Sequence, residues 1–547
     1  MTGGIGRRLA HARVQRNGAI AAIGAVAMTM GTVAAGAVAP ASAGTASSAK
    51  VRDVTITIAG LGLDGQPVSL ANNQSALWPL SASNTGAIYG GADGVYQVLP
   101  GKYLVGGYVP LGNGQYQTSV VVEQVTIRKS ETITLDSEGA TPFSVGLTGV
   151  SATEQGQFAD VCVTGGSGRQ RWAMSFMSST SGGTQYIKAF TDKDLALVYH
   201  AFYTGGAGVT YDIAGAHAGG LPASAAFTAN AADLARLTIA ARSGTITGSL
   251  WAAVLDWQYG NGNCGANLSP ELSDRALPGQ VTQYVSPGLL AVGALPASLA
   301  SESSFDTDVR AAAGRSYTET FFNAVAGPTA GTPTINDGLL CSMPGMIYGD
   351  PLATGWAVDA VGTVTLRHGH KSLGERGFGG FTCFRENHKT GWYTMTESAH
   401  HASPPAGVTP ASLSTTIDVT WRFRIPALSS IQYTSGVQLP ATVTTFSPAG
   451  LSLANQVAPG TTSIVMHVIR NGGYSAAMAL SYPLRAVRVQ YSSDGGRYWQ
   501  DATVTVRRGY WVVTVPSSGS AVSLRSTVTD VRGDSTVETI YNAYGVS

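Results

Sequence analysis

The sequence predicts an all-β protein in which tandem β-sandwich domains, transthyretin-like and immunoglobulin-like, follow a signal peptide. Gly is abundant, with 69 residues, and only 12% of the 547 residues are charged. β-branched and polar residues alternate in short runs, as half-buried strands require, and turn residues separate these runs. Only residues 223–241, which are rich in Ala and Leu, also allow a short helix.

Residues 1–43 have the features of a signal peptide. Four arginines precede an apolar run over residues 18–39, and Ala41-Ser42-Ala43 is a small-residue cleavage site. An uncleaved anchor is the alternative, because the run is long enough to span a bilayer. The Gly and Ala content of the run and the cleavage site favour removal. We therefore expect a secreted, extracellular chain, exported by the Sec or the twin-arginine route, with no membrane association after cleavage.

The charge of the mature chain argues against two classes of partner. Removing the four arginines of the signal leaves 33 − 4 = 29 basic residues against 32 acidic residues, a net charge of −3. Proteins that bind nucleic acids or anionic membranes usually carry a marked excess of basic residues. We therefore expect no nucleic-acid partner.

The mature chain divides into four predicted β-rich units: 51–145, 146–280, 281–435 and 436–547. The first unit begins with a β-branched strand at Val54–Ile58. The third unit ends with the alternating run Thr415–Phe423, and Pro426 follows it. The last unit has the regular strand spacing of an immunoglobulin-like sandwich. Its expected strands are Ser463–Ile469, Ala486–Tyr491, Thr503–Val506, Tyr510–Val515 and Val522–Thr529.

The four cysteines are expected to form two disulfides. An even count in an exported chain is typical of disulfide pairing, and no spacing resembles a CxxC redox or zinc motif. Three pairings are possible, and the pairing Cys162–Cys264 with Cys341–Cys383 keeps each bridge within one predicted unit.

A histidine-rich stretch gives the best candidate for chemistry. Histidines 368, 370, 388, 400 and 401 fall within 34 residues. His368 and His370 face the same way if one strand carries both, so they are candidate metal ligands, and His388 is a third. The alternative is that His368-Gly369-His370 forms a hairpin turn and that the other histidines lie on the surface.

No catalytic motif accompanies these histidines. The sequence has no Gly-x-Ser-x-Gly elbow and no His-Glu-x-x-His motif. We therefore expect a protein that is not an enzyme and that needs no cofactor. A metal-dependent hydrolase around His368–His401 is the alternative function.

Three other patterns have an ordinary structural interpretation. Ser492-x-Asp494-x-Gly496-x-x-Trp499 matches an Asp-box, which predicts a braced turn. Arg532-Gly533-Asp534 resembles an adhesion motif, but Gly and Asp are also typical of a hairpin turn. A group of aromatic residues forms either a stacking surface for a polymer or part of the core. These are Trp251, Trp257, Tyr259, Trp392 and Tyr393.

The order of several short motifs resembles the non-catalytic C-terminal accessory region of secreted actinobacterial subtilisin-like serine peptidases. The motifs are Leu99–Tyr103 with Ile133–Asp136, Arg315–Glu319 running to Gly327-Pro328, Ser414–Thr416 with Val419–Phe423, Ser492–Gly496 with Trp499, and Val522–Arg525 with Asn542–Gly545. The catalytic domain of those peptidases, with its Asp, His and Ser motifs, is not in this sequence. The resemblance therefore implies a free-standing accessory region, which binds an extracellular protein or a cell-wall polymer or has a structural role.

Overall fold

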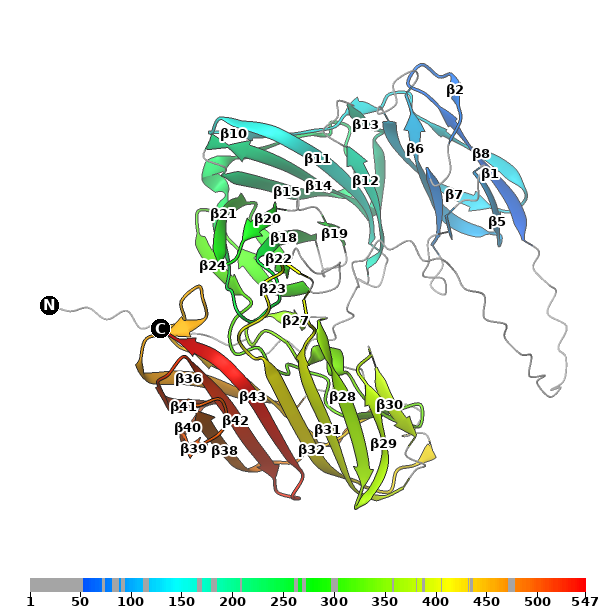
Figure 1. Cartoon of the computed structure of the whole chain (residues 1–547). Helices are drawn as coiled ribbons and strands as arrows, with labels where there is room; N and C mark the ends of the chain where they lie inside the picture. The colour runs from blue at the N-terminus through cyan, green and yellow to red at the C-terminus, as the bar shows by residue number, and fades with distance from the viewer. Residues whose placement is uncertain are drawn as a thin grey trace, which may run out of the picture. The chain divides into compact units, whose positions relative to one another are not determined.

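A computed structural model describes residues 53–547, with gaps at 71–73, 81–87, 90–93, 112–117, 165–169, 179–183, 207–208, 260–263, 268–271, 297–303, 357–358, 380, 386–388, 405, 431, 433–435 and 471–477. Residues 51–547 form one compact unit. The predicted signal peptide lies outside the described residues. The fold is all-β, which confirms the predicted class (Figure 1). No helix among the described residues is long and apolar enough to cross a membrane.

Two sheets near the start of the compact unit face each other across one core. The first contains β1 (Val54–Leu61), β2 (Pro67–Val68), β5 (Val95–Val98) and β8 (Glu131–Asp136). The second runs in the order β4 (Ile88–Tyr89), β3 (Ser75–Pro79), β6 (Gly101–Pro110), β7 (Thr118–Ile127), β13 (Gln185–Ile187), β9 (Thr141–Pro142). Tyr103 and Val105 of β6 enter this core, while Leu104 between them enters the next core. The second sheet is therefore buried on both faces.

The middle of the chain forms three more sheets. One runs β12 (Gln170–Ser178), β11 (Ala152–Thr164), β14 (Phe190–Gly205), β15 (Thr210–Leu221), β21 (Gly279–Val285), β17 (Ala235–Ala241), β24 (Ser316–Phe321). Another runs β19 (Cys264–Asn267), β18 (Leu250–Tyr259), β22 (Gly288–Pro296), β23 (Ser304–Ala311), β27 (Thr354–Trp356), with β20 (Leu272–Ala276) also on β18. The third pairs β10 (Ser144–Thr148) with β16 (Ala226–Asn230).

The short helix that residues 223–241 allowed does not form as an α-helix. This stretch contains β16, the 3₁₀ helix η2 (Ala231–Asp233) and β17. In β17, Leu237, Ile239 and Ala241 are fully buried at a spacing of two residues. Period-two burial is the pattern of a strand, and it outweighs the helix propensity of Ala and Leu.

One sheet of the C-terminal half, called here the large sheet, is built from strands of two predicted units. It runs β29 (Lys371–Gly377), β28 (Ala360–His368), β31 (Gly391–His401), β32 (Thr416–Ile425), β43 (Ser535–Val546), β42 (Ala521–Asp530), β38 (Leu484–Ser492), β39 (Gln500–Asp501), with β35 (Gln456–Val457) also on β43. Because β32 pairs with β43, strands from either side of residue 435 share one sheet.

Two smaller sheets complete the C-terminal half. The first runs β34 (Val443–Pro448), β36 (Gly460–Ile469), β41 (Tyr510–Ser517), β40 (Thr503–Arg507). Phe446 and Val513 of this sheet share a core with Leu524 and Ile540 of the large sheet, which gives a sandwich. All five strands expected in the last predicted unit are present, as β36, β38, β40, β41 and β42.

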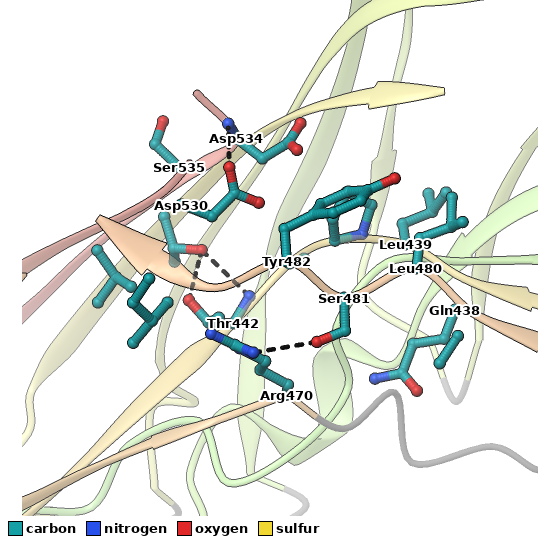
Figure 2. Close-up of a pocket in the computed structure, with 16 residues that line it drawn as sticks. Gln438, Leu439, Thr442, Arg470, Leu480, Ser481, Tyr482, Asp530, Asp534 and Ser535 are labelled. Atoms are coloured by element: carbon teal, nitrogen blue, oxygen red, sulfur yellow. Dashed lines mark hydrogen bonds between the residues drawn. The ribbon is translucent and has the colours of Figure 1, made fainter. Parts of the chain in front are cut away.

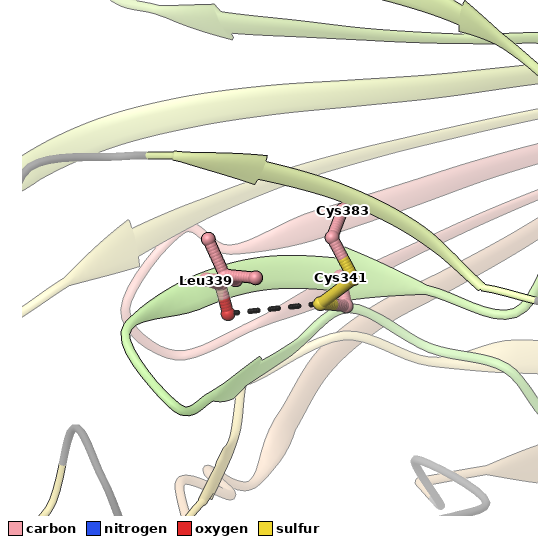
Figure 3. The surroundings of a disulfide bond; sticks show 3 residues. All are labelled: Leu339, Cys341 and Cys383. Carbon is pink, nitrogen blue, oxygen red and sulfur yellow. Dashed lines mark hydrogen bonds between the residues drawn. A yellow bond between two sulfur atoms is a disulfide. The ribbon is translucent and has the colours of Figure 1, made fainter. Parts of the chain in front are cut away.

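The remaining small sheet carries a disulfide. It runs β30 (Thr382–Arg385), β26 (Leu339–Ser342), β25 (Thr334–Asn336), β33 (Val437–Gln438), β37 (Met478–Ala479), and the 3₁₀ helix η3 (Pro344–Met346) follows β26. Cys341 of β26 is bonded to Cys383 of β30 (Figure 3). Cys162 is disulfide-bonded as well, but the side chain of Cys264 lies outside what the structure describes.

Candidate functional site

The first two candidate metal ligands are separated by a hairpin turn. β28 ends at His368, and Gly369 has the positive φ of 55° of a tight turn that leads into β29 at Lys371. The two rings would face one ion only if a single strand carried both residues. The strand ends before His370, so this condition is not met. The His368 ring stacks on Tyr393, with 4.5 Å between the ring centroids, and its Nε2 lies 3.2 Å from the Thr390 carbonyl oxygen.

The other histidines of this stretch do not complete a metal site within the described residues. His388 lies outside them, and His400 is an exposed side chain of β31. In the described part of the chain, no group of three or more His, Cys, Asp or Glu residues is placed to hold a metal ion.

His401 instead forms a buried pair with Asp359. His401 Nδ1 lies 2.8 Å from Asp359 Oδ2, and the hydroxyl of Thr247 donates to the same oxygen at 2.7 Å. These bonds outweigh burial, so the pKa of Asp359 lies below its ordinary value. His401 also stacks on Tyr348, at 4.1 Å. An Asp–His pair can start acyl transfer only if a nucleophile is hydrogen-bonded to the second ring nitrogen of the histidine. The buried Nε2 of His401 has no hydrogen-bond partner among the described residues.

A second buried histidine was not anticipated from the sequence. His200 of β14 is fully buried, and its Nε2 lies 3.5 Å from Asp212 Oδ1 of β15. Burial lowers the pKa of His200 to about 3 and raises that of Asp212 well above its ordinary value. Both side chains are almost completely shielded from solvent.

The Asp-box sequence forms the braced turn that it predicted. Ser492 Oγ donates to Asp494 Oδ1 at 2.6 Å, and the backbone N–H groups of Arg497 and Tyr498 donate to the same oxygen at 3.1 and 3.0 Å. These bonds hold the pKa of Asp494 below its usual range. The motif is therefore a structural turn.

The Arg532-Gly533-Asp534 sequence also forms a turn. Asp534 is 3% exposed, and its Oδ1 accepts the backbone N–H of Arg424 at 2.7 Å. The backbone N–H groups of Arg532 and Asp534 both donate to Asp530 Oδ1. A buried carboxylate that holds a neighbouring strand is not available to an adhesion receptor.

The aromatic residues do not form one stacking surface. Trp251 and Tyr393 are fully buried in the core. Trp257 donates its indole N–H to the Pro287 carbonyl oxygen at 3.2 Å. Trp392 lies under the guanidinium of Arg422, and the side chain of Tyr259 lies outside the described residues. Core packing, the second interpretation, thus applies to Trp251 and Tyr393.

A small pocket lies beside the 530–534 turn (Figure 2). Arg470 Nη1 donates to Ser481 Oγ at 3.1 Å on one side, and Thr442 donates its hydroxyl to Thr536 Oγ1 at 3.0 Å on another. Tyr482 and Asp530 also line it. The polar groups of the pocket are suited to hydrogen bonding with a polar ligand group, and none of them is paired as a nucleophile with a base.

Next to this pocket, one end of the large sheet carries four exposed arginines. They are Arg367 of β28, Arg422 and Arg424 of β32, and Arg532 of the 530–534 turn, and they are called here the arginine cluster. Arg367 and Arg422 both lie opposite Thr394, and Arg422 lies opposite Ser535, the first residue of β43. The strand pairing therefore brings together residues that are up to 165 positions apart in the sequence.

Sequence reasoning missed the arginine cluster because its members come from separate hairpins. The one local signal was the alternation Trp421-Arg422-Phe423-Arg424, which puts two arginines on the polar side of a strand.

Comparisons with known proteins do not assign a family. No family model matches this chain, and no curated protein matches it. The alignment with the solved structure of BcpA, the major pilin subunit of Bacillus cereus, covers 49% of this chain and 99% of the pilin chain, at 8% identity and a TM-score of 0.12. A streptococcal ancillary pilin matches 49% of this chain and 98% of its own, at 11% identity and a TM-score of 0.12. Trypsin-activated alpha-2-macroglobulin from Escherichia coli matches 91% of this chain and 49% of its own, at 9% identity and a TM-score of 0.13. At these TM-scores the likenesses carry no argument about function.

Proposed function

We propose that this chain is a secreted, non-enzymatic β-sandwich protein that binds a partner outside the cell. The partner is an extracellular protein or a cell-wall polymer. The observation that carries the proposal is the solvent face of the large sheet, where Ser398 and His400 of β31 and Arg422 and Arg424 of β32 are exposed on neighbouring strands. A broad polar face on a rigid sheet offers many hydrogen bonds to a partner.

The state of the candidate chemical groups supports the non-enzymatic part of the proposal. Asp494 braces a turn and Asp534 holds the backbone of β32. His401 is held by Asp359, with no nucleophile on its other nitrogen among the described residues. Catalysis by a nucleophile and a base requires the two within hydrogen-bond reach of each other.

Retention on cell-wall material tests this function. The mature protein is mixed with isolated cell-wall material, and separately with immobilised secreted proteins, at several salt concentrations. We expect stable retention on one of the two. No retention at any salt concentration would contradict the proposal.

Metal content, measured on the same preparation, tests the hydrolase alternative. We expect less than about one tenth of an equivalent of bound metal in the wild type and in the double variant with His368→Ala and His370→Ala, because a turn separates the two rings. A stoichiometric metal that this double variant loses would contradict the non-enzymatic assignment.

A further inference from the structure

Neutral groups hold three members of the arginine cluster in place. The Arg422 guanidinium carbon lies 4.0 Å from the centre of the Trp392 ring. Arg532 lies over the Tyr482 ring at 4.6 Å and donates to its hydroxyl at 2.8 Å. Arg367 Nη2 donates to the carbonyl oxygen of His370 at 3.2 Å. Aromatic rings and carbonyl groups fix the direction of a guanidinium without cancelling its charge.

An arginine elsewhere in the large sheet shows the contrasting arrangement. Arg488 Nη2 lies 2.7 Å from Asp501 Oδ1, in an ion pair between two exposed side chains. Among the described residues, no ion pair includes a member of the arginine cluster. The positive charge of the cluster is therefore available to a partner.

Of the carboxyl groups near the cluster, two are buried and one is exposed. Asp530 and Asp534 are buried, and Asp534 Oδ1 accepts the backbone N–H of Arg424. Burial raises the pKa of Asp534 to about 6, and Asp530 adds to this rise, while the backbone N–H of Arg424 and the charge of Arg532 lower it. Glu375 of β29 is exposed and lies opposite Thr365, which is two residues from Arg367 on β28. Lys371, the first residue of β29, adds an exposed positive charge at the same end.

The spacing of the cluster suits an extended ligand. Arg422 and Arg424 are two residues apart on one strand, which separates them by about 7 Å. Arg367 lies two strands from Arg422, which corresponds to about 10 Å. Guanidinium groups bind phosphate and carboxylate groups through paired hydrogen bonds. A chain with repeated anionic groups can contact several of these arginines at once.

We propose that the arginine cluster binds an anionic polymer of the cell wall through its repeated phosphate or carboxylate groups. This inference rests on the proposed function and names the chemistry of the partner. The mature chain has a net charge of 29 − 32 = −3, so the positive charge at this end of the large sheet is local and is opposite in sign to the charge of the whole chain. Overall attraction between the chain and a polyanion does not account for it.

Binding to defined polymers tests the inference. Polyphosphate and polygalacturonate are the two anionic probes, dextran is the neutral probe, and duplex DNA is a fourth. We expect binding to polyphosphate or polygalacturonate that weakens at least about tenfold when all of Arg367→Gln, Arg422→Gln and Arg424→Gln are present. Rising salt concentration weakens the same binding because it screens the charges. Which of the two polymers binds more tightly identifies phosphate or carboxylate as the recognised group.

A matched variant removes the same charge from other places. Arg128→Gln, Arg507→Gln and Arg508→Gln replace three exposed arginines, one in the first sandwich and two where β40 turns into β41. We expect this variant to bind within about twofold of the wild type, because distant exposed charges are screened by salt. Thermal unfolding of both triple variants checks that each retains its fold.

Four results would overturn the inference: equal weakening in the two triple variants, no binding to either anionic polymer, equal binding to dextran, or tighter binding to DNA than to the anionic polymers. The retention assay on cell-wall material keeps the two proposals apart. If the wild type and the cluster variant are retained equally on that material, the proposed function stands and the arginine cluster is not its site.

Discussion

The two faces of the large sheet differ in what their polar residues do. On the inner face, Glu397 and Glu538 are almost completely buried, and both lie opposite Val419 of β32. On the outer face, arginine and threonine side chains reach solvent or one another. Burial makes an inner carboxyl group costly to ionise, while an outer guanidinium stays charged. The inner face thus determines stability, and the outer face offers charge and hydrogen bonds to a partner.

The pH dependence of stability gives the largest expected difference between the faces. Burial raises the pKa of Glu538 to about 8 and that of Glu397 to about 7. Because the pKa of Glu538 is higher in the folded state, its contribution to the free energy of unfolding is fully present below the unfolded pKa of 4.5. This contribution is lost as the pH rises towards the folded pKa. For Glu538 the loss between about pH 4.5 and pH 9 is about 5 kcal/mol.

Replacement of Glu538 isolates the contribution of this carboxyl group to the pH dependence of stability. We expect Glu538→Gln to flatten the decline of the free energy of unfolding from about pH 5 to pH 9, because the amide stays neutral throughout. Glu375→Gln, at an exposed position of the same sheet, is the control and leaves the decline unchanged. Chemical denaturation at a series of pH values measures both. An identical decline in wild type and Glu538→Gln would show that Glu538 is not buried as described.

Two adjacent residues of β32 give the next comparison. Trp421 points inward, is 1% exposed and donates its indole N–H to the Thr442 carbonyl oxygen at 2.8 Å. Thr420 points outward. We expect Trp421→Ala to lower the free energy of unfolding by about 3–5 kcal/mol, because it leaves a cavity and an unpaired carbonyl group. Urea denaturation measures the loss, and a cost in Thr420→Ala as large as that in Trp421→Ala would remove the distinction between the faces.

A hydrogen bond on the outer face gives the smallest expected effect on stability. The hydroxyls of Thr396 and Thr420 lie 3.1 Å apart across β31 and β32. We expect Thr396→Val to cost about 0.5 kcal/mol or less, because water replaces a half-exposed hydrogen bond and Val suits a strand. The same urea titration tests it, and a loss above about 2 kcal/mol would mean that this face is buried against another part of the protein.

Much of the fold is encoded in local patterns of the sequence. The alternation in Val522–Thr529 predicted β42, and the Ser, Asp and Gly positions of 492–496 predicted a braced turn. These patterns are local because a strand has a fixed period and a turn needs particular residues. Period two also puts Glu538 on the same side as Ile540, so this buried carboxyl was readable in principle.

The candidate site was not predictable in the same way. His368 and His370 are near in sequence, but a turn separates them, while Arg367 and Arg422 meet only through the pairing of three strands. Long-range pairing depends on packing across the whole sheet, which no short motif encodes. The pairing of His401 with Asp359 likewise joins positions 42 residues apart.

Hydroxyl-radical footprinting of the full chain on cell-wall material tests the central claim most directly. Trp392 and Tyr482 hold two of the cluster arginines, while Tyr498, which is 77% exposed, lies in the turn beyond the other end of β38. We predict that bound material lowers the labelling of Trp392 and Tyr482 several-fold and leaves that of Tyr498 unchanged. Protection of Tyr498 with unchanged labelling of Trp392 and Tyr482 would contradict the account.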